Sequence, residues 1–547
     1  MPNKMKFDSE KRPVGIIIGG ISLSPDEEPA EACNIAAKEM KRAGIDPARL
    51  RFSICKSSVD ARKKNDVRLV YSVAVQSADG KSPVKTPKSK YTVSALYNQE
   101  LSFSTGSEKS KYPPLVVGMG PAGLFCALLL AENGYAPVII DRGDSVAERV
   151  KSHDRFMKLG ILDTESNIQF GAGGAGTFSD GKLMTRVNDP RISYVLRRFC
   201  DFGAPEEILV KAKPHIGTDL LCGIVDGMLA RIEELGGRVL YRTRLDGIER
   251  SADGTVTAKT SKGDIPCSSL CLAVGHSARD TYEMLLKKGY AIEVKPFSVG
   301  VRIEHLQSKI DEALYGSFAG HPRIGKGEYH LSDTSTGRGV YTFCMCPGGE
   351  VVAAASEEGG VVVNGMSRFA RDGRNANSAV CVSVRPEDHG NTPMSAIEFQ
   401  RSLERRAFLA GGKNYCAPIQ TVGDFLTEKR GSEPCEVLPT YRNGQVKLSS
   451  MDECLPEFVC RELRHGLLSF DRKVSGFATE CAVLSGVETR TSSPLRILRG
   501  ENMTAVGNDG IYPCGEGAGY AGGITSAALD GIRVAEKIMS RFSPAEK

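Results

Sequence analysis

The chain has 547 residues, 41% of them hydrophobic and 25% charged, which suits about two to four domains with at least one large core. Apolar runs such as residues 124–131 are far shorter than the roughly 20 residues that a membrane span needs, and the first residues lack the apolar core of a secretion signal. We therefore expect a globular protein without membrane spans, located in the cytoplasm.

Charge and cysteine content restrict the function further. Residues 1–111 hold 20 Lys or Arg and 13 Asp or Glu, whereas the rest of the chain has a net charge of −2. A solvated charged face explains this surplus more simply than a partner does, so nucleic-acid binding by this part stays an unfavoured alternative. The 16 cysteines form no CxxC pair and no zinc-site spacing, which predicts reduced, mostly buried thiols and no metal site.

The first part of the chain predicts a small α/β module. Its expected elements are strands at 14–22, 49–55 and 67–75 and a helix at 24–44. The helix prediction depends on Ser24, Pro25 and Glu27, which have the spacing of a capping box with proline at the first helical position. Residues 76–114 are polar and rich in Lys, Ser and Pro, so we expect a linker. The basic module and its linker are therefore assigned to residues 1–110.

A strand, a glycine turn, a helix and a second strand follow. They are expected at 114–119, 121–133 and 136–141. Gly118, Gly120 and Gly123 form a GxGxxG turn, and Asp141 ends the second strand 18 residues later. This pattern is the dinucleotide fingerprint: the glycines allow a tight turn, close approach to a pyrophosphate and close helix packing, and the acid accepts hydrogen bonds from a ribose. The helix N-terminus offers free N–H groups to the phosphates.

The glycine spacing alone is weak evidence, because similar runs recur at residues 171–176 and 517–522 without the strand and the acid. Four later segments narrow the choice of cofactor. They are a glycine-dense loop at 167–183, an edge at 241–249 whose backbone near Leu245 would meet an adenine, a buried strand at 269–275 ending in Ala273-Val274-Gly275, and a strand, acidic turn, glycine turn and helix at 510–538. The residues by themselves predict a dinucleotide, with a flavin as one option.

The order of these segments resembles the glutathione-reductase-type flavoproteins, in which FAD lies extended through one discontinuous domain. Within that group, "QFGAGGAGTFSDGK", "AVGHSARDTYEML", "CMCPGGEVVAAASEEGG", "NGMS" and "GVETRTSSP" resemble the bacterial family of FAD-dependent, or NAD(FAD)-utilising, dehydrogenases. The resemblance covers nearly the whole chain, including "KSSVDARKKND" in the module. One departure is Glu516, where the wider superfamily commonly has Asp; either carboxylate can face the ribityl chain or the pyrophosphate.

The resemblance implies an α/β fold with a discontinuous Rossmann-type FAD-binding domain. Its two parts would be residues 111–293 and 471–547, and a substrate (cap) domain of mixed β-sheet and helix would be inserted at 294–470. The ADP half would lie on Gly118, Gly120, Ala122, Gly123, Asp141 and Arg142. The ribityl and flavin would lie on Gly173, Gly174, Ala175 and Gly176, with Ala273 and Gly275 beside them and Gly515, Glu516, Gly523 and Ile524 closing the other side.

Several polar residues are candidates for catalysis beside the flavin. His276 and His305 are candidate acid–base groups, and each is equally a hydrogen-bonded structural histidine. Arg279 would bind a carboxylate or phosphate, or else pair with nearby Asp280 or Glu283. Arg490 and Glu488 precede the C-terminal glycine turn and are candidate polar groups of the active site. Cys346 is a weaker candidate for a redox thiol, because no CxxC partner accompanies it.

The expected function is an FAD-dependent oxidoreductase that moves two electrons between a reductant and a small-molecule substrate. A second nucleotide domain is missing, so NADH or NADPH, if used, would bind transiently from the cap side. Two alternatives stay open: a flavin monooxygenase, and an RNA-associated or non-catalytic flavoprotein that uses the basic module.

Overall fold

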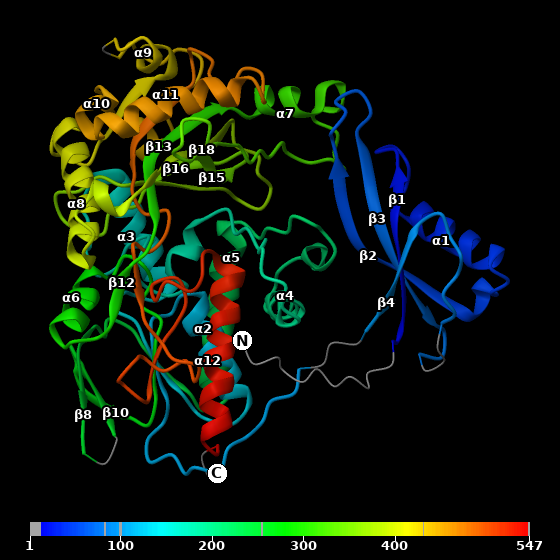
Figure 1. The fold of residues 1–547 in the computed structure, drawn as a ribbon, viewed down its shortest axis with the longest axis horizontal. Helices are drawn as coiled ribbons and strands as arrows, with labels where there is room; N and C mark the ends of the chain where they lie inside the picture. The colour runs from blue at the N-terminus through cyan, green and yellow to red at the C-terminus, as the bar shows by residue number, and fades with distance from the viewer. Residues whose placement is uncertain (1–12, 81–83, 98–100, 253–254, 430, 545–547) are drawn as a thin grey trace.

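The computed structural model describes residues 13–80, 84–97, 101–252, 255–429 and 431–544 (Figure 1). The N-terminal module is an antiparallel sheet with strand order β2-β3-β1-β4 and one covering helix, α1. The bounds are β1 Gly15–Leu23, α1 Ala30–Arg42, β2 Leu50–Asp60, β3 Arg68–Ser77 and β4 Thr92–Leu96. Ile18, Met40 and Val73 belong to a hydrophobic cluster of its own. Figure 1 shows the module beside the body of the molecule.

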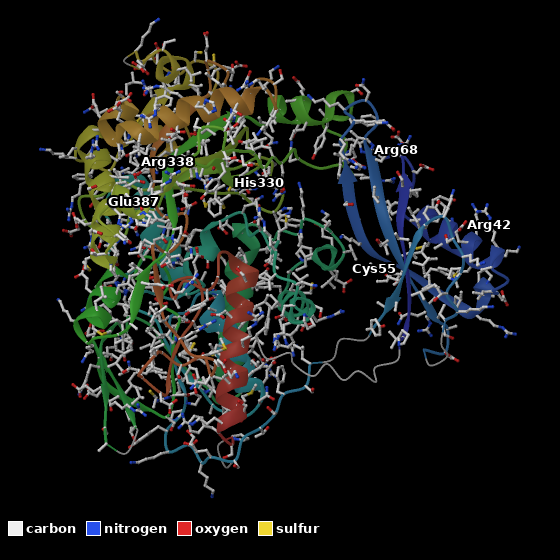
Figure 2. The ribbon with its side chains drawn as sticks, viewed as in Figure 1. Arg42, Cys55, Arg68, His330, Arg338 and Glu387 are labelled. Atoms are coloured by element: carbon white, nitrogen blue, oxygen red, sulfur yellow. The ribbon has the colours of Figure 1, made fainter. Side chains whose placement is uncertain are left out.

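Two sequence predictions for the module need correction. The helix begins at Ala30 and not at Ser24, although Ser24 and Glu27 do form a capping turn. A helix from Pro25 would carry Pro29 in its second turn, where proline has no N–H to donate and clashes with the preceding turn. Within the expected linker, β4 pairs with β1 as a fourth strand. Part of the module's positive charge, such as Arg42, lies on the side away from the body (Figure 2).

The body contains a five-stranded parallel sheet with strand order β23-β11-β5-β6-β7. The bounds are β5 Leu115–Val117, β6 Val138–Ile140, β7 Arg238–Leu240, β11 Leu270–Leu272 and β23 Ile511–Pro513. β23 and helix α12 (Ile524–Arg541) come from the C-terminal part of the chain. Because β5, β11 and β23 are neighbours and parallel, the loops that follow them gather at one edge of the sheet.

Helix α2 (Pro121–Glu132) is apolar throughout its length and lies against α12. A Cβ atom on Gly531 of α12 would lie 2.0 Å from the carbonyl oxygen of Ala122, so the two helix backbones are in direct contact. Helices α4 (Arg191–Asp201) and α5 (Thr218–Glu234) complete this layer. The layer fixes the start of α2 and the start of α12 close to the sheet edge.

The second large sheet has seven strands in the order β14-β15-β18-β13-β21-β19-β20. The bounds are β13 Phe297–Leu306, β14 Ser332–Asp333, β15 Val340–Cys346, β18 Asn375–Val384, β19 Ala417–Thr421, β20 Val446–Leu448 and β21 Val483–Glu488. β21 lies beyond the expected domain boundary at residue 470, yet it pairs with β13 and β19. This sheet therefore extends into the segment that the sequence analysis assigned to the FAD-binding domain, and the boundary needs that correction.

The two sheets share one hydrophobic core, which includes Leu115 and Leu272 of the parallel sheet and Val301 and Val380 of the seven-stranded sheet. The remaining strands are β8 Leu245–Arg250, β9 Val256–Thr260, β10 Gly263–Cys267, β12 Ile292–Val294, β16 Glu350–Ala353, β17 Val363–Met366 and β22 Leu495–Ile497. The remaining helices are α3 Val146–Leu159, α6 Arg279–Lys287, α7 Gln307–Tyr315, α8 Pro393–Ala410, α9 Val422–Leu426, α10 Met451–Cys454 and α11 Glu457–Asp471. Within the described ranges, no helix is both long enough and apolar enough to cross a membrane.

Candidate functional site

The first glycine turn lies at the carboxyl end of β5. Gly118 has φ +104°, and a Cβ atom there would lie 2.2 Å from the carbonyl oxygen of Ala273. A Cβ atom on Gly123 would lie 1.8 Å from the oxygen of Gly118. Gly120 differs, because it is half-buried and the nearest atom to its Cβ position is 3.9 Å away. Gly118 and Gly123 thus permit packing, and Gly120 leaves bare backbone facing open space.

Asp141 joins three loops through its carboxylate. Oδ2 accepts a hydrogen bond from the N–H of Met119 at 2.9 Å, and Oδ1 accepts from Gly143 and Gly171, each at 2.9 Å. Because a carboxylate has about four lone-pair positions, one remains for a ribose hydroxyl. The sequence analysis predicted the ribose role but not the positioning role. Gly143, the last residue of the sequence "DRG", indicates the positioning role, because a Cβ atom on Gly143 would lie 2.6 Å from Cα of Gly171.

The second glycine loop, residues 171–176, packs directly on the first turn. Gly173 donates to the carbonyl of Met119 at 2.8 Å, and a Cβ atom on Gly174 would lie 2.9 Å from Cα of Gly120. Arg149 of α3 is fully buried and donates to the carbonyls of Asn167, Ala172 and Ile168 at 2.7, 2.7 and 2.5 Å. The sequence analysis missed Arg149, because nothing in the residues around it distinguishes it from a surface arginine on a helix.

The loop after β23 closes the same edge. Gly515 donates to Asp530 Oδ2 at 2.8 Å, and a Cβ atom on Gly517 would lie 2.3 Å from the carbonyl oxygen of Gly275. By contrast, Gly275, Gly522 and Gly523 are exposed, with no atom within 4 Å of their Cβ positions among the described residues. Glu516 is half-buried, and its Oε2 accepts from the N–H of Gly523 at 3.4 Å. Bare backbone from β11 and from the start of α12 therefore faces open space next to a carboxylate.

Two helices begin at this edge without a side-chain cap. The cap residue of α2 is Gly120 and that of α12 is Gly523, and a glycine has no side chain that could cap the first turn. The first N–H groups of both helices are available to a ligand and carry a partial positive charge. Ile524 of α12 lies beside the second glycine loop, since its Cγ1 is 3.3 Å from the Cβ position of Gly176.

These features fit an extended, negatively charged dinucleotide. Half-exposed backbone runs from Gly120 through residues 174–176, and it is flanked by Gly275 and Gly523. Side chains at these glycines would fill the space that such a cofactor needs, and the two helix starts favour its phosphates and other anionic groups. The groups assigned to the adenine end lie nearby: Arg142 donates to Asp280 at 2.5 Å and stacks on Phe170, and Leu245 begins β8.

His276 is held at the open end of β11, directly after Gly275. Its Nε2 lies 3.0 Å from the carbonyl oxygen of Arg490, and its Nδ1 lies 3.2 Å from Oγ of Ser277. Because the carbonyl only accepts, Nε2 carries the proton of the neutral ring. Ser277 also reaches Gln169 Oε1 at 3.1 Å. Burial lowers the pKa of His276, so the neutral form with Nδ1 available predominates at neutral pH.

Arg279 and Arg490 are buried on either side of Glu404, a residue of α8. Arg279 donates to Glu404 at 2.8 and 2.9 Å, and Arg490 donates to it at 3.1 and 3.2 Å. The two guanidinium groups hold the pKa of Glu404 well below its usual range. The expected alternative partners of Arg279, Asp280 and Glu283, were wrong: its second carboxylate is Glu357, at 2.5 Å. The acidic partners lie more than 70 residues away, so local sequence did not show them.

His305 occupies a different environment from His276. Its Nε2 lies 2.7 Å from the carbonyl oxygen of Phe477, and its ring lies 4.9 Å from the ring of Phe477. The side chain is 2% exposed, and burial lowers its pKa to about 4. The structure thus places His276 beside the glycine loops, whereas the contacts of His305 are those of a core histidine.

The second glycine loop continues into a charged cluster that the sequence analysis missed. Asp180 accepts from Lys182 at 2.8 Å and from Arg371 at 2.9 and 2.5 Å, and Glu328 accepts from Arg371 at 2.5 Å. Arg371 and Glu328 also line a cavity of about 690 Å³ between the module and the body. Other lining residues are Ser57, Val59, Tyr71, Glu207, Lys211, Lys213, His215, Tyr315, Arg323 and Lys326. Each of the five Lys or Arg in this lining pairs with a carboxylate, and the two most exposed of them are Lys211 and Lys213.

Known proteins place the chain among flavoproteins. Residues 296–491 match the family described as FAD-dependent protein, C-terminal domain-like, and residues 17–76 match a domain family of unknown function. The protein is FAD-dependent, and FAD is its cofactor. A Clostridium beijerinckii protein described as uncharacterized is 45% identical over 542 residues, which cover 97% of this chain and 99% of the relative. The chain belongs to the same family as this relative.

Similarity to solved structures is lower. The L-amino acid deaminase from Proteus vulgaris has 12% identity and a TM-score of 0.32, over 82% of this chain and 97% of that chain. A thioredoxin reductase from Lactococcus lactis has 15% identity and a TM-score of 0.18 over 30% of this chain, which spans 36% of that reductase.

Proposed function

We propose that the protein is an FAD-dependent oxidoreductase that transfers two electrons between a reductant and a small anionic substrate. The observation that best supports the proposal is the open backbone surface at the sheet edge. Three glycine segments contribute to it, two uncapped helix starts face it, and His276 adjoins it. When bound, FAD supplies a flavin that accepts or gives two electrons.

The chain's residues would hold the cofactor from end to end. The N–H groups at the start of α2, beginning at Gly120, would bind the pyrophosphate. Asp141 and Arg142 would bind the ADP half, and residues 174–176 would run along the ribityl chain. Glu516 would accept from a ribityl hydroxyl, and the N–H groups at the start of α12 would face the polar edge of the flavin.

His276 is the residue best placed to move a proton. With Nε2–H donated to the carbonyl of Arg490, the ring can accept a proton only at Nδ1. Once protonated, Nδ1 would donate to Ser277 Oγ, whose hydroxyl would then donate to Gln169 Oε1. The buried cluster of Arg279, Arg490 and Glu404 would act as a positioning group, because it fixes the backbone carbonyl on which the tautomer depends.

The cavity between module and body is the proposed entrance for substrate. Lys211 and Lys213 are exposed on its wall, and Arg371, which also lines it, pairs with Asp180 four residues after the second glycine loop. A small carboxylate or phosphate would be attracted to this wall and led toward that loop. NADH and NADPH are anionic as well, so a transient reductant would be attracted by the same charges.

Anaerobic mixing of the holoprotein with NADH, NADPH and small carboxylates or phosphates tests the proposal. We expect at least one compound to bleach the visible absorbance of the flavin, and a second compound to restore it. Absence of bleaching by every compound, with the flavin still reducible by dithionite, would contradict an oxidoreductase of this kind. Hydroxylation of a product upon reaction with oxygen would instead support a monooxygenase.

The cavity's role can be tested through its charge. Replacing both Lys211 and Lys213 with Glu should raise the KM of the bleaching compound by about tenfold or more, which corresponds to about 1.4 kcal/mol of binding free energy. The flavin spectrum should not change, because neither lysine contacts the glycine loops. Replacing both Lys287 and Lys288 with Glu, at the end of α6, gives an exposed control with the same charge change. Equal KM values in the cavity variant and the control would contradict this entrance.

A further inference from the structure

Two cysteines in "CMC" at the end of β15 lie where the strand loses its regular shape. Residue 343 pairs with 379, but residue 346 pairs with 377, so the register shifts between them. Cys344 has φ +45°, which no regular strand contains. In a regular strand, residues i and i+2 are about 6.6 Å apart, which is near the upper limit for a disulfide. The sequence analysis considered only Cys346, because it looked for a CxxC partner.

The two thiols contact one another. Cys346 Sγ donates to the carbonyl oxygen of Cys344 at 3.4 Å. Cys344 is half-buried, whereas Cys346 is fully buried. Residue 344 therefore lies nearer the surface than residue 346. This arrangement is typical of an attacking thiol with a resolving partner.

A buried arginine adjoins the pair. Arg302 of β13 donates through Nη1 to the Cys344 carbonyl at 3.1 Å, and the same nitrogen lies 3.9 Å from Cys346 Sγ. Its Nε donates to Glu488 at 3.0 Å. Gly365 is required here, because a Cβ atom would lie 2.1 Å from Arg302 Nη1. The hydrogen bond from Cys346 and the positive charges of Arg302 and Lys182 lower the pKa of Cys344 to about 6.

Other neighbouring cysteines lack these features. Cys435 and Cys481 lie 3.3 Å apart near the surface. Their hydrogen bond, burial and the carboxylates of Glu436 and Glu480 raise the pKa of Cys481, so the thiolate of Cys481 is disfavoured. Both pairs of cysteines are therefore close together, and the neighbouring cations Arg302 and Lys182 distinguish the pair of Cys344 and Cys346. The second pair provides a matched control within the same chain.

The pair also lies close to the proposed cofactor site. Lys182, whose charge acts on Cys344, lies six residues after the second glycine loop. The next residue, Leu183, accepts from Thr525 Oγ1 at 2.7 Å, and Thr525 is in the first turn of α12. One short segment, residues 180–183, therefore separates the thiols from the helix start that we assign to the flavin.

We propose that Cys344 and Cys346 form a redox-active dithiol that passes two electrons from reduced FAD to a disulfide substrate. The proposal rests on the proposed function and names its substrate class. The Cys344 thiolate attacks one sulfur of the substrate, whose S–S bond breaks, and one thiol leaves. Cys346 then attacks the Cys344 sulfur, the second thiol leaves, and a Cys344–Cys346 disulfide forms. Reduced FAD gives two electrons and two protons to this disulfide, which returns to the dithiol as FAD is reoxidised.

Reductive titration of the holoprotein tests the proposal. After oxidation with a small disulfide such as oxidised glutathione and removal of the reagent, anaerobic dithionite should deliver about four electrons per FAD, because flavin and disulfide each take two. Cys344→Ser and Cys346→Ser should each take about two. Cys435→Ser should take the same number as the parent protein. An uptake of about two by the parent, or a loss of two electrons in Cys435→Ser alone, would overturn the proposal.

Alkylation of the unaltered protein gives a second measurement that needs no variant to fold. Iodoacetamide should modify the reduced protein first at Cys344, with a rate that rises through about pH 6, and it should modify Cys435 more slowly at pH 7. Faster reaction of Cys435 at pH 7 would overturn the assignment. Because dithionite reduces flavin directly, these results are independent of whether NADH or NADPH serves as the reductant, and they separate this proposal from the proposed function.

Discussion

At the scale of single residues, the glycines at the candidate site divide into two groups. Gly118 and Gly123 are required by neighbouring backbone, whereas Gly120, Gly275 and Gly523 leave open space. The sequence predicts the motif, because spacing and the following acid are local features. It does not predict which glycines face a ligand, because that depends on loops that follow three different strands. Replacement of a packing glycine should therefore disturb the fold, and replacement of an open one should disturb cofactor binding.

Asp141 provides a test of both roles. Asp141→Asn keeps one oxygen but loses the charge, so it weakens hydrogen bonds from Met119, Gly143 and Gly171, and hydrogen bonds to a charged group contribute about 1.5–3 kcal/mol each. We expect the free energy of unfolding of the FAD-free protein to fall by about 2 kcal/mol or more in urea denaturation, and the affinity for FAD to fall as well.

Asp246→Asn is the matched control, because Asp246 is exposed on β8 and pairs only at the surface with Arg244. Its expected loss is within about 0.5 kcal/mol. Weaker FAD binding with unchanged stability of the FAD-free Asp141 variant would show that the carboxylate serves the ribose alone.

His305 predicts the pH dependence of stability. Its pKa is about 4 in the folded protein and about 6.5 in an unfolded chain, so the unfolded chain binds an extra proton between these values. The contribution of His305 is therefore complete above about pH 6.5 and is lost as pH falls toward 4, by about 3 kcal/mol. His305→Gln should remove this part of the pH dependence in urea denaturation series.

The control for this prediction is His465→Gln, at a half-exposed histidine of α11. It should leave the pH dependence nearly unchanged. If the curves of the parent protein and His305→Gln run parallel from pH 7 to pH 4, the core role of His305 is wrong.

At the scale of elements, the start of α12 has the most direct consequence for chemistry. Its first N–H groups face open space after Gly523, so they should stabilise the negative charge that reduction brings to the flavin. Ser526→Asp places a carboxylate in this turn, where the present hydroxyl accepts from the N–H of Gly522 at 3.1 Å. A helix start contributes about 0.3–2 kcal/mol to an anion, and 1.4 kcal/mol equals about 30 mV for two electrons. The midpoint potential should fall by roughly 10–40 mV.

Ser540→Asp at the other end of α12 has the same charge change and should not alter the potential in spectroelectrochemical titration. Thr525 is less suitable than Ser526, because it is buried and bonded to Leu183. An unchanged potential in Ser526→Asp that still holds FAD would mean that α12 does not face the flavin.

Element prediction from sequence succeeded where local pattern decides the structure. The helix at α2 and the strands β1 and β13 have apolar patterns that determine them locally. The predicted start of α1 was wrong, because Pro29 does not fit inside a helix that begins at Ser24. The strand β4 was missed, because the sequence of a polar edge strand resembles that of a linker. The position of β21 depends on pairing with β13, nearly 200 residues earlier in the chain, and no local pattern contains it.

At the scale of the whole molecule, the candidate site combines predictable and unpredictable parts. The sequence already indicated the glycine loops, Asp141 and His276 as candidates, because motifs and strand ends mark them. Arg149, Glu404 and the Cys344–Arg302 contact were not, because each depends on charges buried against segments distant in the chain. The sequence did not predict the cavity between module and body either, because its walls come from residues that are distant in sequence.

The separate roles of the module and the body can be tested. The module has its own hydrophobic core, but Ser57 of β2 hydrogen-bonds Val210 and Ala212 of the body at 2.7 and 2.8 Å, and the module forms one wall of the cavity. Removal of residues 1–100 should therefore leave FAD binding intact and raise the KM of the anionic substrate. The cut is placed before residue 101 because Gly106 and Glu108 hydrogen-bond the end of α12.

Two measurements on the shortened chain separate the possible roles of the module. The FAD content after reconstitution reports the cofactor site, and the rate of flavin bleaching at low and high substrate concentration separates KM from the maximal rate. The expected result is full FAD content with an effect confined to KM, because the glycine loops lie wholly in the body. The shortened chain lacks only the module's side of the cavity, opposite the side that carries Lys211 and Lys213. Loss of FAD by a chain that still unfolds cooperatively would mean instead that the module is needed to hold the second glycine loop in place, acting through Ser57, residues 210–212 and the Arg371–Asp180 pair.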